Sequence, residues 1–237
     1  MADGPIAEQL EPAAPPTSWL PAFDWKAAII LVLGVALLTI VHYHPDPLNL
    51  DARYRLFSWQ ALNFVLLFIV PVLAIKFVFR ERLSDYGLRL GEWRVWGKWL
   101  LLFLVVFIPV AAIASRLPEF ARYYPRYRPM LLNHWLIFAS MGGWLVYFCA
   151  WEFFFRGFML FGLGKRIGAL AIFVQMIPFV MAHFPKPELE SWAAIIAGVA
   201  LGLMAWRCKS FVGPWLLHWL AATAMDLFVV FWPLHPR

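Results

Sequence analysis

Long apolar stretches recur along the whole chain and rule out an ordinary water-soluble fold. They cover about residues 25–41, 56–79, 99–115, 134–163, 169–183, 192–206 and 211–231. About twenty apolar residues in a helix cross the hydrocarbon core of a bilayer. Hydrophobic residues make up 63% of the chain and charged residues only 14%, whereas charged residues make up about a quarter of a soluble domain. We therefore predict an all-α, polytopic transmembrane helical bundle with 7–8 spans.

The chain divides into a short arm and one membrane domain. Residues 1–24 carry acidic residues and prolines and lack the basic-then-apolar pattern of a signal peptide, so we expect a disordered cytoplasmic arm. Residues 25–237 are predicted to form a single transmembrane domain. The stretch 134–163 is too long for one upright span, and Gly142 and Gly143 are the predicted place for a bend.

Lysine and arginine in the short loops predict the orientation. Residues 80–98 are the most basic connection, so we place them in the cytoplasm together with the N-terminus. The basic pairs at 165–166 and 207–209 then also lie inside, whereas the basic loop 116–128 falls outside as an exception. The net charge of +6 is accounted for by loops next to lipid headgroups, so no nucleic-acid partner is expected.

Glu152 and Arg156 lie inside an apolar stretch, one helical turn apart, so their side chains share a face and can pair. An ionisable residue at membrane depth costs roughly 2.5–3.5 kcal/mol on insertion scales, and it usually faces a protein interior and serves a function. The plainer interpretation is a buried ion pair that holds helices together. The pair therefore marks a candidate site whose other members must be sought in the remaining spans.

His183 and His218 are two further polar residues within the predicted spans. Helical rise places Glu152, His183 and His218 about 20, 21 and 12 Å from the cytoplasmic ends of their helices, which is inside the bilayer core. A carboxylate and two imidazoles at these depths can supply a general base and oxyanion donors for hydrolysis, or they can hold zinc with an open position. An interfacial histidine and a structural hydrogen bond are the plainer interpretations of His183 and His218.

These residues resemble the CPBP family of intramembrane proteases, which comprises CAAX-prenyl and bacteriocin-processing proteins. The family pattern is E-E-x-x-x-R, then F-x-x-x-H, then H-x-x-x-N/D, each on a membrane helix. The corresponding segments here are WEFFFR at 151–156, FVMAH at 179–183 and HWLAA at 218–222. The likeness covers about residues 135–231, and residues 83–89 also look like the stretch that precedes the family core.

The chain departs from that pattern at two polar positions. Trp151 stands where the family has its first carboxylate, which is generally taken as the water-activating base, and Ala222 stands where Asn or Asp is usual. Asp226 lies about 12 Å beyond His218 along the helix and is too far to replace Ala222. Two interpretations remain open: Glu152 has become the base of a divergent enzyme, or the chain is a catalytically inactive pseudoprotease that binds a client or acts as a scaffold.

The resemblance implies an intramembrane endopeptidase that cleaves a membrane-associated peptide or protein with glutamate-activated water. Glu152 would activate the water, Arg156 would orient it, and the two histidines would stabilise the oxyanion or relay protons. The expected catalytic residues are Glu152, Arg156, His183 and His218, and the expected cavity-lining residues are Trp151, Phe179, Ala222 and Asp226. We expect a bacterial inner (plasma) membrane as the location, the lipid bilayer and a peptide substrate as partners, and no cofactor, with zinc considered and not favoured. The substrate and the oligomeric state stay open.

Overall fold

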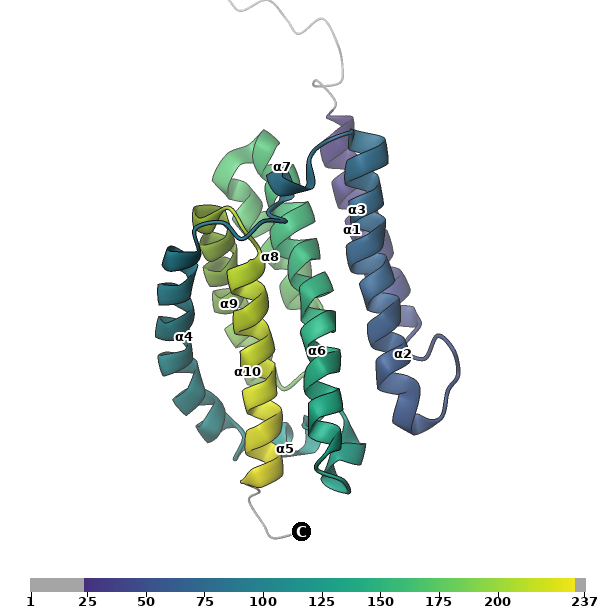
Figure 1. The fold of residues 1–237 in the computed structure, drawn as a ribbon, viewed down its shortest axis with the longest axis vertical. Helices are drawn as coiled ribbons and strands as arrows, with labels where there is room; N and C mark the ends of the chain where they lie inside the picture. The colour runs from purple at the N-terminus through teal and green to yellow at the C-terminus, as the bar shows by residue number, and fades with distance from the viewer. Residues whose placement is uncertain (1–23, 233–237) are drawn as a thin grey trace, which may run out of the picture.

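The computed structural model describes residues 24–232 (Figure 1). Nearly all of the predicted N-terminal arm lies outside these described residues. Its last residue, Asp24, is the N-cap of helix α1 (Trp25–Tyr43) and accepts hydrogen bonds of 3.0 Å from the backbone N–H groups of Lys26 and Ala27. A carboxylate at this position satisfies two N–H groups that have no partner within the helix, and it balances the positive end of the helix dipole.

The predicted all-α fold class is confirmed, and the described residues contain helices and no strand. The remaining α-helices are α2 (Ala52–Phe64), α3 (Val70–Leu73), α4 (Trp93–Ala114), α5 (Pro118–Tyr123), α6 (Leu136–Glu152), α7 (Leu160–Ile167), α8 (Ala171–Met181), α9 (Glu188–Cys208) and α10 (Val212–Phe231). Wider π-helical segments are η1 (Val65–Ile69), η2 (Ala74–Phe79) and η5 (Phe153–Met159), and tighter 3₁₀ turns are η3 (Leu83–Tyr86), η4 (Arg128–Leu131) and η6 (Gly168–Leu170).

Six helical segments within the described residues are long and apolar enough to cross a membrane, which identifies an integral membrane protein. They are Trp25–Tyr43, Arg53–Phe79, Trp93–Ala114, Leu136–Met181, Glu188–Cys208 and Val212–Phe231. The segment Leu136–Met181 turns at Gly168, which has a φ of 56°, so it contains both the fourth and the fifth predicted apolar stretch. Counted in this way, the six segments contain seven spans, which is the lower end of the predicted range of 7–8.

The bend predicted at Gly142 and Gly143 is wrong. Helix α6 runs through both glycines without a break, and the irregular segment η5 begins only after Glu152. Gly143 lies in close contact with α2 instead, because a Cβ atom there would displace the end of the Gln60 side chain. The glycine thus lets two helices approach each other without bending its own helix.

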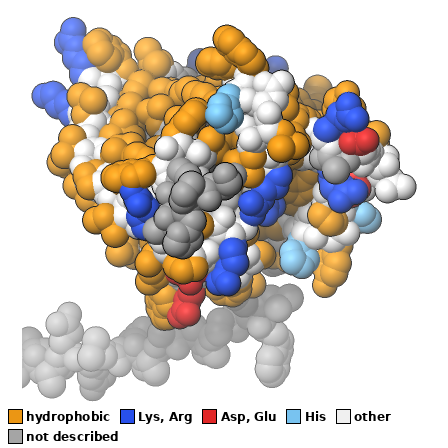
Figure 2. Space-filling model, turned by 90° about the horizontal axis from the view of Figure 1, so that it is seen from below, with side chains coloured by type: hydrophobic (Ala, Val, Ile, Leu, Met, Phe, Trp, Pro, Cys, Tyr) orange, Lys and Arg blue, Asp and Glu red, His pale blue; other side chains and the backbone are white. Residues whose placement is uncertain are grey.

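The N-terminus of α1 and the basic loops that were predicted to lie on one side of the membrane are found at the same end of the bundle (Figure 1). The start of α1, the connection from η2 to α4, and the turns after α7 and α9 lie at one end, and α10 finishes at the opposite end. Figure 2 shows this opposite end, where Lys and Arg side chains lie among hydrophobic ones. Which end faces the cytoplasm stays a prediction.

A carboxylate network joins three parts of the chain at the end where α1 begins. Glu81 accepts hydrogen bonds from Lys26 of α1 at 2.7 Å, from Lys165 of α7 at 2.5 Å and from the Tyr86 hydroxyl at 2.7 Å. The Tyr86 side chain is buried, and the Phe211 N–H donates to the Gly87 carbonyl. The connection after η2 is therefore packed into the fold, between α7 and the start of α10.

We expect the stability of this end to fall in acid. Partial burial raises the pKa of Glu81, but hydrogen bonds from Lys165, Lys26 and Tyr86 outweigh it and lower the pKa from 4.5 to about 2. A carboxylate with a lowered pKa stabilises the fold fully above the unfolded value of 4.5, and this contribution is lost as the pH falls towards 2. Thermal unfolding in detergent, followed from neutral to acidic pH, measures the effect. A Glu81→Gln variant should lose less of its melting temperature over that range than the wild type, and equal losses would contradict the prediction.

Candidate active site

Glu152 and Arg156 form a buried ion pair at the junction between α6 and η5. Arg156 Nη1 lies 3.3 Å from Glu152 Oε1, and Arg156 Nε lies 3.2 Å from Glu152 Oε2. Both side chains have an exposed fraction of 0%. The predicted pairing across one helical turn is present even though the helix widens after Glu152. π-Helical segments within α-helices occur often at functional sites, and this one places the arginine.

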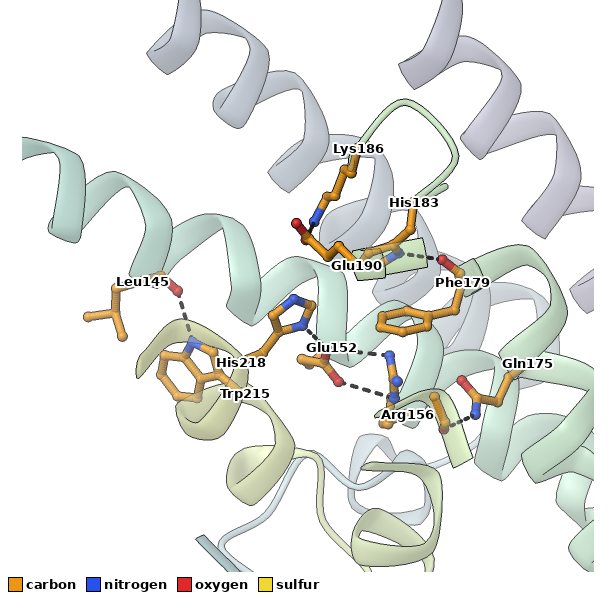
Figure 3. A network of polar contacts seen from close by, with 11 residues as sticks. Leu145, Glu152, Arg156, Gln175, Phe179, His183, Lys186, Glu190, Trp215 and His218 are labelled. Carbon is orange, nitrogen blue, oxygen red and sulfur yellow. Dashed lines mark hydrogen bonds and ion pairs between the residues drawn. The ribbon is translucent and has the colours of Figure 1, made fainter. Parts of the chain in front are cut away.

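His218 of α10 contacts the same carboxylate from the other side. Its Nδ1 lies 2.6 Å from Glu152 Oε1, and 13% of its side chain is exposed (Figure 3). Two indole N–H groups of α10 fix the register against α6: Trp215 donates to the Leu145 carbonyl at 2.8 Å, and Trp219 donates to the Met141 carbonyl at 3.0 Å. Glu152 is thus enclosed between Arg156 and His218, and the imidazole is the member of the three that remains partly exposed.

His183 completes the group from the turn after α8. Its Nδ1 lies 2.7 Å from the Phe179 carbonyl, and its ring centroid lies 6.4 Å from that of His218 with the two planes 21° apart. A carbonyl oxygen only accepts hydrogen bonds, so Nδ1 of His183 carries the hydrogen. When either imidazole is neutral with its hydrogen on Nδ1, its Nε2 is a hydrogen-bond acceptor. The structure therefore brings together the two histidines and the Glu–Arg pair.

The residues predicted to line the cavity divide into two groups. Phe179 lies 4.0 Å below the Arg156 guanidinium and 4.6 Å from the His183 ring, so it is part of the site. Trp151 is buried, with its ring 6.5 Å from that of His183. These three distances place Phe179 between Arg156 and His183, and Trp151 on another side of the His183 ring.

Ala222 and Asp226 continue along α10 beyond His218. Ala222 is partly buried against the main apolar core. Asp226 is buried and accepts a hydrogen bond of 3.2 Å from the Trp144 indole of α6. No hydrogen bond or ion pair joins Asp226 to Glu152, Arg156 or either histidine among the described residues. Its carboxylate therefore links α10 to α6 through Trp144, at a place separate from Glu152 and its partners.

Several buried polar atoms of the site have no hydrogen-bond partner within residues 24–232. They are Glu152 Oε2, Arg156 Nε and Nη2, and Trp151 Nε1. Arg156 Nε is close enough to Glu152 Oε2 for an ion pair, but their geometry is not that of a hydrogen bond. Each unsatisfied buried polar atom lowers the stability of a fold by about 1–3 kcal/mol. Four such atoms in one place therefore indicate a role other than stabilising the fold.

The chemistry of this arrangement favours proton transfer at His218. A buried carboxylate that holds Nδ1–H of an imidazole orients the ring and stabilises its protonated form, which leaves Nε2 to take a proton. Within the described residues, no group of three or more His, Cys, Asp and Glu side chains is placed to hold a metal ion. The site thus has the parts of an acid–base dyad, with Arg156 beneath the carboxylate.

Sequence reasoning missed several buried polar residues outside the motifs. Gln60 and Asn63 of α2 and Ser140 of α6 are buried within membrane-spanning segments. The signal was present in the sequence, since amide and hydroxyl side chains interrupt apolar stretches there. It was overlooked because neutral polar residues are common in membrane helices, where they usually bond to a neighbouring helix.

Comparison with known families agrees with the motif assignment. Residues 133–224 match the model of a family described as type II CAAX prenyl endopeptidase Rce1-like. This segment includes Glu152, Arg156, His183 and His218. Comparisons with curated proteins and with solved structures found no match. The family match over residues 133–224 therefore confirms the resemblance seen in the motifs, and it is consistent with a member of the CPBP family.

Proposed function

We propose that this protein is an intramembrane endopeptidase that hydrolyses a membrane-associated peptide or protein. The observation that carries the proposal is the 2.6 Å contact between His218 Nδ1 and Glu152 Oε1, deep in the bundle. The family match over residues 133–224 supports a peptidase fold. The proposal differs from the sequence-based one in the role of Glu152. Its carboxylate is fully buried and already contacted by Arg156 and His218, so His218 is the better candidate for activating water.

The proposed reaction uses this chain's own residues. His218 Nε2 removes a proton from a water molecule, whose oxygen attacks the carbonyl carbon of the scissile peptide bond. Glu152 holds the imidazole by Nδ1 and stabilises the imidazolium that forms. The tetrahedral intermediate collapses as the C–N bond breaks, and the proton on His218 Nε2 passes to the leaving amine nitrogen. The products are a new carboxylic acid and a new amine, and one water is consumed.

Arg156 and His183 have supporting roles in this proposal. Arg156 pairs with the buried carboxylate at 3.2 Å and fixes its rotamer. His183 donates Nδ1–H to the Phe179 carbonyl, so its Nε2 is the nitrogen that can accept the second hydrogen of the water. We propose no metal ion for this reaction. A strong zinc chelator should therefore leave the rate of probe cleavage unchanged.

A client-binding pseudoprotease is the second candidate. The observation that favours it is the apolar character of the two positions where the family pattern has polar residues, Trp151 and Ala222. Trp151 is buried in an aromatic stack, with its ring 5.5 Å from Tyr147 and 4.9 Å from Phe155. In this interpretation, Glu152 and Arg156 only hold helices together.

Cleavage of defined probes by the purified protein in vesicles distinguishes the two candidates. The family description suggests a quenched-fluorescent peptide that carries a farnesylated cysteine near its C-terminus, with the same peptide lacking the prenyl group for comparison. The enzyme proposal predicts one cut per peptide, located by mass spectrometry. Saturable binding of either probe without any cut would contradict the enzyme and support the client-binding protein.

We further propose that the bilayer is that of a bacterial inner membrane and that the end where α1 begins faces the cytoplasm. The support is the gathering of Lys26, Lys165 and Arg166 at that end of the bundle. Positive residues in short loops favour the cytoplasmic side.

A further inference from the structure

Helices α2 and α6 enclose polar side chains that the proposed reaction does not use. Gln60 of α2 is 4% exposed, and neither its Nε2 nor its Oε1 has a hydrogen-bond partner within the described part of the chain. Asn63 Oδ1, one turn further on, and Ser140 Oγ of α6 are buried and unpartnered in the same way. Both helices belong to segments that cross the membrane.

Such groups are costly in a membrane protein, where lipid cannot satisfy them. The chain shows how a buried amide is normally handled: Gln175 of α8 donates from Nε2 to the Ile172 carbonyl at 2.8 Å and to the Gly198 carbonyl at 3.0 Å. Gln60 has no such acceptor within residues 24–232. Its primary amide offers one donor group and one acceptor side by side, which matches the C=O and N–H groups of an extended peptide backbone.

The unpartnered groups follow one face of α6 that leads to the active site. Ser140, Gly143, Tyr147 and Trp151 recur every three or four residues and therefore share a face. This face packs on α2, because Gly143 contacts the Gln60 side chain and the Tyr147 ring stacks on Trp59 with centroids 4.9 Å apart. The face ends at Trp151, which precedes Glu152 in the chain. The indole N–H of Trp151 has no hydrogen-bond partner within the described residues.

We propose that the seam between α2 and α6, defined by Gln60, Asn63, Ser140 and Gly143, binds the extended backbone of the peptide substrate. A membrane peptide must lose its helical hydrogen bonds around the scissile bond before it can be hydrolysed, and in the bilayer core only the protein can replace them. The Gln60 amide pairs with one peptide unit of the substrate, which takes the place of the contact that the Gln60 side chain now makes with Gly143. This proposal rests on the proposed endopeptidase function.

Substitution of Gln60 by Met tests the seam, because Met has a similar size and shape but no polar hydrogen-bonding amide. We expect the KM for the farnesylated probe to rise about tenfold with little change in kcat, as for one lost backbone contact. We also expect the melting temperature to stay the same or to rise, because an unsatisfied buried amide is removed. Gln60→Asn, which keeps an amide, should recover part of the binding.

Gln175→Met is the matched control, since it removes an amide that has two partners. It should lower the melting temperature. If Gln60→Met also lowers the melting temperature, or leaves the KM unchanged while the wild type cleaves the probe, the seam proposal is wrong and the endopeptidase proposal stands. If the wild type binds the probe but does not cut it, the function proposal fails. The affinity of the wild type and of Gln60→Met for the uncut farnesylated peptide then tests the seam by itself, with weaker binding to Gln60→Met as the expected result and equal binding as the contrary one.

Discussion

Replacing Glu152 with Gln is expected to lower kcat for probe cleavage by about 10³- to 10⁴-fold, with the KM nearly unchanged. The carboxylate accepts the His218 Nδ1–H at 2.6 Å, and an amide at this position no longer stabilises the imidazolium. A Gln side chain can also present its NH₂ group, which would favour the tautomer with hydrogen on Nε2, where no proton can be accepted. The KM changes little because the buried carboxylate does not reach the substrate.

Glu81→Gln is the matched control for this prediction. It also converts a hydrogen-bonded glutamate into an amide, but its network lies at the end of the bundle where α1 begins. At neutral pH its kcat should equal that of the wild type. Steady-state kinetics in vesicles of one lipid composition give both values. A kcat for Glu152→Gln within threefold of the wild type would show that the carboxylate does not act on His218 during the reaction.

Replacing Arg156 with Met is expected to lower the free energy of unfolding by about 3–5 kcal/mol. The change leaves the fully buried Glu152 carboxylate without the cation that lies 3.2 Å away, and burying an unpaired charge is strongly unfavourable. Because Met retains the length of the side chain that packs on Phe179, most of the loss reports the charge rather than a cavity.

The double variant Glu152→Gln with Arg156→Met separates this effect from packing. Removing both charges should restore most of the stability, since two neutral partners no longer need each other. Denaturant titrations in mixed micelles measure all three variants against the wild type. If the double variant is as unstable as Arg156→Met alone, the loss came from packing, and the ion pair is not what Arg156 contributes.

The sequence predicted the parts of the site that depend on spacing and helix type. Glu152 and Arg156 are four residues apart, and that separation predicts a pair on any helix. His183 and His218 stand out because an imidazole in an apolar stretch is rare, and helical rise places them at compatible depths. The seven apolar stretches were located from hydropathy alone, because lipid forces each span to satisfy its own backbone.

Other features depend on contacts between helices that no local pattern encodes. Considered from the sequence alone, Gly143 predicts a bend. Its contact with the Gln60 side chain of α2 shows that it serves close packing instead. Asp226 had no assigned partner until the structure placed the Trp144 indole beside it. Glu152 was expected to meet water, yet α10 encloses it with His218, which moves the proposed proton acceptor to the imidazole. The direction in which a helix presents a side chain at a crossing comes from tertiary packing.

The most direct test of the central claim is the rate of probe cleavage by a His218→Ala variant whose helicity and melting temperature are checked against the wild type. The claim is that Nε2 of His218 takes the proton from water while Glu152 holds Nδ1. The account predicts cleavage by the wild type and a kcat at least about 10³-fold lower in the variant, because no other imidazole contacts Glu152 within the described residues. Cleavage at the wild-type rate by the folded variant would contradict it.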